Sequence, residues 1–344
     1  ERSGGTIEPL PKLQWFVAVN KEFGSPKTTL KEIMRKSVEN GQIKILPERE
    51  EKKYFHWIDN LRDWNISRQL WYGHRIPVWY HEPKCVPRKG HEGDIVKCKE
   101  MIVSETKPKC EFCDAEFAQD EDTLDTWFSS SLWNFSTLGW PDENAPDLKT
   151  YHPTSFMNPG YEILFFWVAR MILMSGFLLD EIPFKTVYLH GVLRDAKGQK
   201  FSKSLDTGMD PVDVINQYGA DALRMSVIVG IAPGNDGNFS LDKVKAYKYF
   251  ANKLWNIARF VLMSIPEGSE TEKSKLTTED AKIVKDLKTF VKGITEHMDN
   301  YRLYLAADEI YHYIWHTFAD KFIEESKSKL VSEDRAVKES SQRM

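Results

Sequence analysis

Cysteine is scarce in this chain: 4 of its 344 residues are cysteine, and all of them lie between Cys85 and Cys113. So few thiols, confined to one segment, exclude a scaffold stapled by disulfides and favour a reducing, intracellular setting. An excess of charge of one sign is also lacking, because the formal net charge is -4. Whole-chain electrostatics therefore do not indicate a nucleic-acid binder, although basic residues confined to one face would still allow one.

A long hydrophobic run free of charge is missing as well. The longest apolar stretch, residues 163–179, includes Arg170 near its middle and follows Glu162. A membrane span would bury that guanidinium in the bilayer core, which is costly. The stretch therefore predicts a buried helix of a globular domain, and no membrane partner is expected.

Hydrophobic patterning in the first two thirds of the chain predicts an α/β fold. Residues 26–45 predict a helix followed by a strand, and a helix near 161–177 precedes a β-branched and aromatic strand at 185–191. That strand ends on Gly191. A strand after a helix, with a glycine-containing loop at its carboxyl end, indicates a parallel sheet with a ligand crevice at that edge.

After about residue 240 the pattern becomes helical throughout. Three amphipathic stripes at three-to-four spacing predict a helix bundle. Ser240 is the predicted N-cap of the first helix, and Thr277 with Asp280 resembles a capping box before the second.

The segment 81–118 is rich in Lys, Glu and Cys, poor in large aliphatic residues, and predicted to be an excursion from the α/β domain. Thiolates at the intervals seen here could close a tetrahedral, structural zinc site. The four candidate ligands are Cys85, Cys98, Cys110 and Cys113. Two alternatives remain open: His81 or His91 in place of one sulfur, or a set of free thiols.

A loop rich in lysine and small residues follows the strand that ends on Gly191. It presents Lys200 and Lys203, flanked by Ser202 and Ser204. Small residues let the main chain approach a ligand, and two ammonium groups suit a polyphosphate that gains charge during reaction. The loop therefore indicates ATP or pyrophosphate as the ligand.

The sequence KFSKS in that loop resembles the KMSKS motif of class I aminoacyl-tRNA synthetases, with Phe201 in place of Met. Four further stretches are similar to this family, and to its valyl type in particular. They are 63–80 (DWNISRQLWYGHRIPVWY), 119–130 (QDEDTLDTWFSS), 165–171 (FFWVARM) and 252–260 (NKLWNIARF). The resemblance extends over nearly the whole chain.

The resemblance implies roles for particular residues. Trp127 and Trp167 match the tryptophans that wall an aliphatic amino-acid pocket. The implied ATP-binding residues are Gly160, Glu162, His190, Gly191, Ser202, Lys203 and Ser204, with Lys200 and Lys203 stabilising the phosphates during catalysis. Glu162 stands where the family has Asp, which keeps an acceptor for the ribose on a longer side chain. Arg68 and residues 71–74 are candidates either for ordering the site and touching the tRNA acceptor end or for packing.

The resemblance also implies a domain organisation. Residues 1–20 would return from an editing domain, and 21–239 would form the second half of a Rossmann-like catalytic domain with the zinc-ribbon-like insertion. Residues 240–344 would begin a helical anticodon-binding domain. The family's other signature, His-x-Gly-His, does not occur in the sequence. This chain alone is therefore expected to be inactive, as a part of a longer enzyme.

The implied activity is ATP- and Mg²⁺-dependent activation of valine and its transfer to tRNA(Val), by a cytoplasmic and monomeric enzyme. Isoleucine is the nearest alternative substrate. A catalytically silent RNA- or protein-binding piece, and a free-standing zinc-ribbon binding module, are the alternatives from other functional classes.

Overall fold

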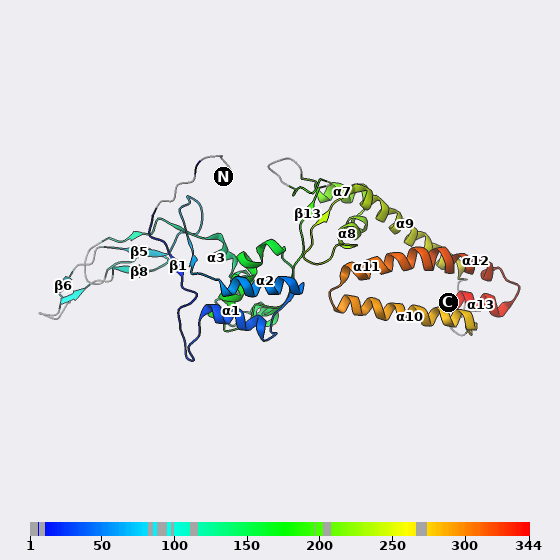
Figure 1. Cartoon of the computed structure of the whole chain (residues 1–344), viewed down its shortest axis with the longest axis horizontal. Coiled ribbons are helices and arrows are strands. Elements are labelled where there is room, and N and C mark those ends of the chain that lie inside the picture. The colour runs from blue at the N-terminus through cyan, green and yellow to red at the C-terminus, as the bar shows by residue number, and fades with distance from the viewer. Residues whose placement is uncertain are drawn as a thin grey trace. The chain divides into compact units, whose positions relative to one another are not determined.

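The computed structural model of the chain divides into two compact units, Glu1–Leu189 and His190–Met344 (Figure 1). The structure describes residues 6, 11–81, 85–87, 95–97, 100–110, 116–195, 197–201, 208–265 and 274–344, and for 85–87 and 95–97 it describes the main chain only. Each unit has its own hydrophobic core.

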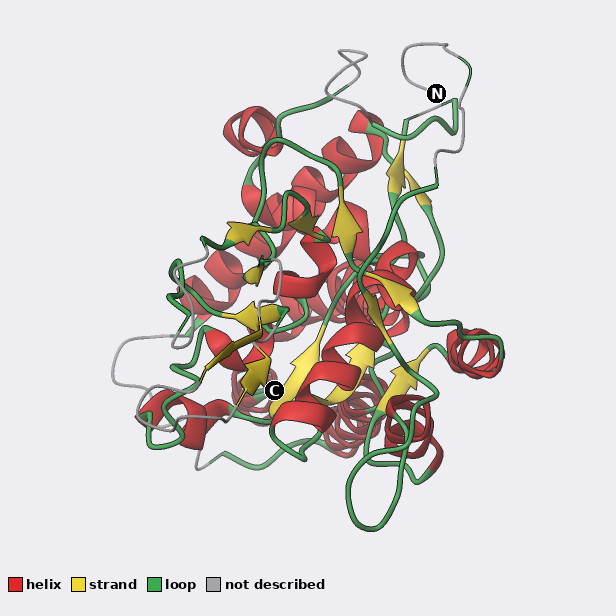
Figure 2. Cartoon of the chain, turned by 90° about the vertical axis from the view of Figure 1, so that its left-hand side faces the viewer, coloured by secondary structure: helices red, strands yellow, loops and turns green. Residues whose placement is uncertain are grey.

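The centre of the first unit is a parallel three-stranded sheet in the order β11-β12-β2. Its strands are β11 (Thr154–Met157), β12 (Phe184–Tyr188) and β2 (Lys44–Leu46). Phe184 and Val187 of the middle strand are fully buried, as expected of a strand covered on both faces. Helix α1 packs against α6, and α2 packs against β2, so helices flank the strands (Figure 2). The predicted parallel α/β sheet is thus present.

The helices of the first unit are α1 (Leu30–Glu39), α2 (Glu48–Asp59), α3 (Thr126–Ser130), α4 (Trp133–Ser136), α5 (Pro146–Tyr151), the 3₁₀-helix η1 (Tyr161–Ile163), the π-helix η2 (Leu164–Val168) and α6 (Ala169–Leu178). Helix α1 begins with a complete capping box, in which Thr29 and Glu32 each satisfy the other's main-chain N–H. Short antiparallel pairs join β1 (Phe16–Val17) to β3 (Trp64–Asn65) and β4 (Ser67–Arg68) to β10 (Thr123–Leu124).

The apolar segment Tyr161–Leu178 is long and apolar enough to cross a membrane by length and composition alone. In the structure most of its apolar side chains belong to or pack against the core of the first unit, where Leu164, Val168 and Ala169 are fully buried, while Phe166 and Phe177 are 49% and 50% exposed. The prediction of a buried helix here is confirmed. Its first half, however, is a 3₁₀ turn and a π-helical turn, which hydrophobic periodicity does not distinguish from an α-helix.

The segment predicted as an excursion leaves and rejoins the unit at paired residues. Strand β5 (Val78–Tyr80) lies between β8 (Met101–Val103) and β9 (Ala118–Gln119), and Tyr80 pairs directly with Ala118. Further out, β6 (Cys85–Pro87) pairs with β7 (Ile95–Lys97). Because Tyr80 and Ala118 are neighbours, the intervening residues can form an insertion without disturbing the sheet at its base.

The second unit is mainly helical, and the predicted bundle helices are present. Its elements are β13 (Leu193–Arg194), α7 (Pro211–Tyr218), α8 (Ala220–Ile228), β14 (Gly237–Asn238), α9 (Leu241–Ser264), α10 (Thr278–Asp299), α11 (Leu303–His312), the π-helix η5 (Tyr313–Ile323), α12 (Glu324–Leu330) and α13 (Arg335–Arg343). Ser240 caps α9 by accepting the main-chain N–H of Lys243, as predicted. Val214 of α7 and Ala222 of α8 share a core with Val244 of α9. The predicted boundary between domains at 239–240 therefore lies inside the second compact unit, His190–Met344. The predicted domain organisation stays a prediction.

The predicted capping box at Thr277 is only half formed. The Thr277 hydroxyl accepts the N–H of Asp280, but the N–H of Thr277 donates to the Ser340 hydroxyl rather than to Asp280. The buried Asp280 carboxylate instead accepts hydrogen bonds from Ser340 and from the ammonium of Lys329, the latter at 2.8 Å. Contacts from α12 and α13 have displaced the local cap, which the sequence around residue 280 does not reveal.

Candidate functional site

The carboxyl ends of the three parallel strands meet at one edge of the first unit. Gly160 and Glu162 follow the end of β11, with Gly160 as the N-cap of η1 and the exposed Glu162 in its first turn. Clefts outside the carboxyl ends of strands are where open α/β sheets bind their ligands. Two of the residues predicted to bind ATP therefore lie at the edge where such a ligand is expected.

The structure brings the two predicted pocket tryptophans onto facing elements. Trp127 belongs to α3 and Trp167 to η2, and these two elements are in contact. The indole Nε1 of Trp167 donates to the main-chain oxygen of Ser130, at the end of α3, over 2.8 Å. The resemblance predicts that both rings wall one pocket. The contact between α3 and η2 places the two rings in the same region of the first unit.

Phe166 is a third aromatic residue at this location that the sequence analysis missed. Its ring stacks on that of Trp127 with centroids 5.8 Å apart and an interplanar angle of 26°. Phe166 and Trp167 are consecutive, and both contact α3 from the π-helical turn η2. Single π-helical turns are frequently found at functional sites. The aromatic run of residues 165–167 was visible in the sequence, but the wide turn that directs two successive rings to α3 was not.

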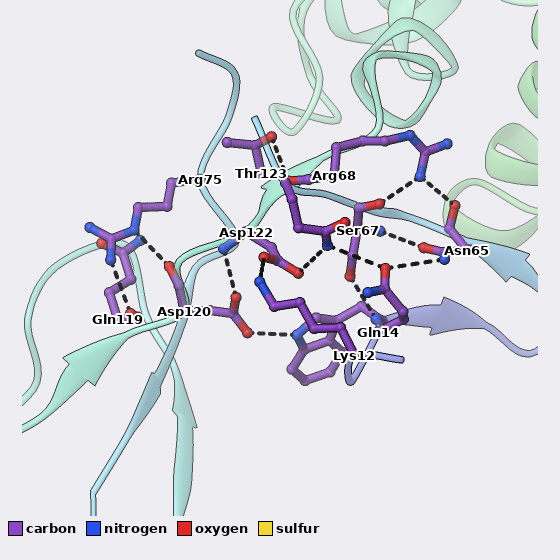
Figure 3. Close-up of polar contacts among 12 residues, drawn as sticks. Lys12, Gln14, Asn65, Ser67, Arg68, Arg75, Gln119, Asp120, Asp122 and Thr123 are labelled. Atoms are coloured by element: carbon purple, nitrogen blue, oxygen red, sulfur yellow. Dashed lines mark hydrogen bonds and ion pairs between the residues drawn. The ribbon is translucent and has the colours of Figure 1, made fainter. Parts of the chain in front are cut away.

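The segment 71–74 lies on an exposed loop of the first unit. Trp71 and Tyr72 are 95% and 90% exposed, respectively. The base of the loop is fixed, because Arg75 donates to the main-chain oxygens of Gln119 and Asp120 (Figure 3). Gln69 also donates to Asp122. Because they are so exposed, the rings of Trp71 and Tyr72 do not pack against the described part of the first unit.

In the second unit, the start of the loop that carries the KFSKS sequence is held by Asp236. Its carboxylate accepts the N–H of Val192 at 2.9 Å and pairs with the guanidinium of Arg194 at 2.6 Å. Gly191 passes so close to the main chain of Asn235 that a Cβ on it would lie 1.8 Å from the Asn235 oxygen. Only glycine fits there without movement of the main chain.

The described part of the loop is a tight hairpin. Asp195 accepts the N–H groups of Lys197 and Gln199, and Gly198 adopts a positive φ of 77° at the turn. The returning arm places an exposed Lys200 opposite Arg194. Phe201 packs edge-on against Phe239 with centroids 6.3 Å apart, so it serves as an apolar anchor. The exposed His190 contacts the oxygen of Gly191 through Nδ1.

Several predicted site residues lie outside the described residues. They are Ser202, Lys203, Ser204, Cys98 and Cys113. Of the remaining cysteines, Cys110 is half-buried, and Cys85 pairs through its main chain with Lys97, the residue before Cys98. His81 packs edge-on against Phe117. Among the described residues no group of three or more His, Cys, Asp or Glu side chains could hold a metal ion. The zinc site therefore stays a prediction.

Relatives of this chain share its sequence over almost its full length. It is 43% identical over 343 residues to the valine–tRNA ligase of Clostridium acetobutylicum and 47% identical over 334 residues to that of Symbiobacterium thermophilum. These alignments cover 98% and 96% of this chain, respectively, but 36% and 34% of the relatives. The chain thus spans about a third of the length of these relatives.

Solved structures show a similar fold at low identity. The Mycobacterium tuberculosis methionyl-tRNA synthetase in complex with methionyl-adenylate matches with a TM-score of 0.66 and 18% identity, over 91% of this chain and 55% of that one. The ternary LeuRS–tRNA–LeuAMS complex of Agrobacterium radiobacter K84 matches with a TM-score of 0.58 and 19% identity, over 86% of this chain and 42% of that one. The predicted fold class, an α/β synthetase domain with a helical part after it, is confirmed.

Two family models match the chain. The model of class I tRNA synthetases for I, L, M and V matches residues 7–240, and that of the anticodon-binding domain of tRNA ligases matches residues 280–343. The first match covers well over half of the chain and contains the aromatic cluster on α3 and η2 as well as the loop held by Asp236. The chain therefore belongs to the class I tRNA synthetases of the isoleucine, leucine, methionine and valine group.

Proposed function

We propose that this chain is part of a valine–tRNA ligase that activates valine with ATP and transfers it to tRNA(Val). The observation that carries the proposal is the 43–47% identity to valine–tRNA ligases over 96–98% of the chain. The aromatic cluster of α3 and η2 supports it, because rigid rings suit a small, dry slot for a branched aliphatic side chain.

In the proposed first step, a carboxylate oxygen of valine attacks the α-phosphorus of ATP. The bond from that phosphorus to the bridging oxygen breaks, and valyl-adenylate and pyrophosphate form. No general base is needed, because the nucleophile is already an anion. In the second step a hydroxyl of the terminal ribose of tRNA attacks the carbonyl carbon, AMP leaves, and the hydroxyl proton passes to solvent.

Lys200 and Lys203 are proposed to stabilise the phosphate charge as it shifts toward the leaving pyrophosphate. The exposed Lys200 on the returning arm of the hairpin supports this role, since an ammonium preorganised beside a developing charge lowers the barrier. Ser202 and Ser204 would bind the same phosphates, and Glu162, Gly160, His190 and Gly191 would hold the nucleoside.

Trp127 and Trp167 are proposed to wall the valine pocket. Isoleucine carries one methylene more than valine, and a difference of that size in an apolar pocket changes binding by about 1–3 kcal/mol. The pocket can therefore prefer valine by excluding the larger side chain of isoleucine. This preference depends on the distance between the two tryptophan walls.

Mg²⁺ is proposed to enter with ATP. The described residues do not form a cage of acidic side chains for it, and Mg²⁺ in such sites is bound largely by substrate phosphates. A structural zinc ion is proposed in segment 81–118, because thiolates are its preferred ligands. Metal analysis of the purified chain tests that site, with one zinc per chain expected and a metal-free set of thiols contradicting it.

The helices of the second unit after residue 240 are proposed to contact the anticodon of tRNA(Val). The match of residues 280–343 to the family model of the anticodon-binding domain supports this proposal. Stacking and charged contacts to unpaired bases would be its mode of recognition. We further propose a cytoplasmic and monomeric enzyme.

ATP–pyrophosphate exchange tests the proposed function. The assay is run on the chain alone and on the chain combined with the preceding part of the Clostridium acetobutylicum relative, with the relative's own matching part as a positive control. We expect exchange in the combined sample only, with valine preferred to isoleucine by about 10- to 200-fold. A preference for isoleucine would reassign the substrate. Absence of exchange, while the control is active, would favour a catalytically silent RNA- or protein-binding piece.

A further inference from the structure

The buried carboxylate of Asp125 joins several elements of the first unit and was not among the predicted site residues. Its side chain lies directly before α3 and is 5% exposed. Its Oδ1 accepts the main-chain N–H of Trp127 at 3.3 Å and so caps the helix. Its Oδ2 accepts the indole N–H of Trp64 at 3.0 Å and pairs with the guanidinium of Arg68 at 2.8 Å.

A second guanidinium, from α6, lies over the indole that donates to Asp125. Arg170 lies over the ring of Trp64, 3.6 Å from its centroid. Burial lowers the pKa of Arg170 to about 10, while the charge of Asp125 acts in the opposite direction and that of Arg68 in the same direction as burial. Arg170 is thus still a cation at neutral pH, and the charge of Asp125 favours that cation.

The position of these groups along the chain links them to the aromatic cluster. Trp127 lies two residues after Asp125, and Arg170 lies three residues after Trp167, on the helix that continues η2. One carboxylate therefore contacts the start of α3 directly and attracts the start of α6. Displacing it would move the two tryptophan-bearing elements relative to each other.

We propose that Asp125 is a positioning residue that sets the spacing of Trp127 and Trp167, and with it the largest amino-acid side chain the pocket admits. This inference rests on the proposed function as a valine–tRNA ligase. Asp125 does not itself touch the substrate. Its contribution is to hold the walls, so its loss should affect binding and discrimination of amino acids more than the rate of the chemical step.

The replacement Asp125→Asn separates the two roles of the carboxylate. An asparagine keeps Oδ1 and can still cap α3, but its amide N–H₂ takes the place of Oδ2 and meets two donors, from Trp64 and Arg68. In the combined sample of the exchange assay we expect the KM for valine to rise by about 10- to 100-fold and the preference for valine over isoleucine to fall about tenfold. The kcat for valine should change by less than about threefold.

Asp122→Asn is the matched control. Asp122 lies in the same segment, is 4% exposed, and pairs with Lys12 at 2.6 Å (Figure 3). It also accepts a hydrogen bond from Gln69 at 2.7 Å. It has no hydrogen bond to α3 or η2 among the described contacts. A general effect of removing a buried paired carboxylate would appear in both variants, whereas a positioning effect appears only in Asp125→Asn.

A readout independent of activity uses the chain alone. Indole N–H resonances of Trp64 and Trp167 report their hydrogen bonds to Asp125 and Ser130, respectively. We expect both resonances to shift in Asp125→Asn and neither to shift in Asp122→Asn. If Asp125→Asn does not fold, Arg68→Gln is used instead. This variant removes one partner of the Asp125 Oδ2 and leaves the cap of α3 by Asp125 intact. The Trp167 resonance should shift in it as well.

Equal KM values and equal discrimination in Asp125→Asn and Asp122→Asn, in an enzyme whose unmodified form is active, would overturn the proposal. An unmoved Trp167 resonance would overturn it as well. If the unmodified sample shows no valine-dependent exchange while the positive control does, the proposed function fails, and the indole resonances alone decide the role of Asp125.

Discussion

The indole Nε1 of Trp167 donates a hydrogen bond to the main-chain oxygen of Ser130 across 2.8 Å. This bond ties η2 to the carboxyl-terminal end of α3, where main-chain oxygens have no partner within the helix. Asp125 caps the other end of the same short helix. Helix α3, which carries Trp127, is therefore held at both ends by groups from outside it.

Replacing Trp167 by Phe should loosen this arrangement while keeping an aromatic wall. The variant loses the hydrogen bond to Ser130, so we expect the free energy of unfolding of the chain to fall by about 1–2 kcal/mol. The valine KM of the combined sample should rise at the same time. Urea denaturation followed by circular dichroism measures the first quantity, and pyrophosphate exchange the second.

Trp255→Phe is the control for that variant. Trp255 lies on α9 and is 74% exposed, so its replacement should change the free energy of unfolding by no more than about 0.5 kcal/mol. Equal losses in the two variants would show that the Trp167–Ser130 bond does not contribute as argued.

The fold class was predictable because its signals are local. A helix followed by a strand at 26–45, a β-branched strand before Gly191, and helical stripes after 240 each follow from the spacing of apolar residues. The same holds for the N-cap at Ser240, whose partner is three residues away. The motif residues were found through resemblance, and the pairing of Tyr80 with Ala118 fits the excursion that composition had indicated.

What the sequence could not provide are contacts between distant residues. Asp125 lies in the stretch 119–130, yet its partners Trp64 and Arg68 come from the stretch 63–80, and Arg170, which its charge affects, comes from 165–171. The capping box expected at Asp280 was incomplete for the same reason, because α12 and α13 supply partners that its local pattern does not show. Sequence patterns predict hydrogen bonds between neighbouring residues well. They do not predict when a residue distant in the chain replaces a local partner.

Gly191→Ala tests the close approach of two main-chain segments in the second unit. The added Cβ would lie 1.8 Å from the oxygen of Asn235 and 2.7 Å from the nitrogen of Asp236. Such a contact forces the main chain apart, so we expect a loss of about 1–3 kcal/mol in the free energy of unfolding. Exchange activity of the combined sample should fall too, because the loop held by Asp236 begins here. Thermal denaturation of the chain measures the stability change.

Gly293→Ala provides the opposite case. Gly293 lies within α10, and apart from its chain neighbours and the main chain of its own helix, no atom of the described residues lies within 4 Å of the Cβ it would gain. Alanine is favoured over glycine inside a helix, so this variant should be more stable by about 0.5–1 kcal/mol. The two changes therefore differ in sign, and a stabilising Gly191→Ala would contradict the contact with Asn235.

Asp280 should make the stability of the helical unit depend on acid pH. Burial raises the pKa of this carboxyl, but hydrogen bonds from Lys329, Ser340 and Thr277 outweigh burial and leave the pKa below its ordinary value. A group whose pKa is depressed in the folded state stabilises that state above its unfolded pKa, which is about 3.9 for Asp. The contribution is lost as pH falls through the lower pKa of the folded state.

Asp280→Asn should therefore cost about 3 kcal/mol or more near neutral pH, because it leaves the Lys329 ammonium without its buried partner. The difference in unfolding free energy between the two proteins should be constant above about pH 5 and shrink below about pH 4. Denaturation curves measured at several pH values give this difference directly. Glu279→Gln is the control, since the Glu279 side chain is 69% exposed although it also pairs with Lys329 at 3.2 Å, and exposed pairs contribute only about 0–1 kcal/mol. A difference for Asp280→Asn that stays constant down to pH 2 would mean that the carboxylate is not the group whose protonation weakens the junction of α10 with α12 and α13.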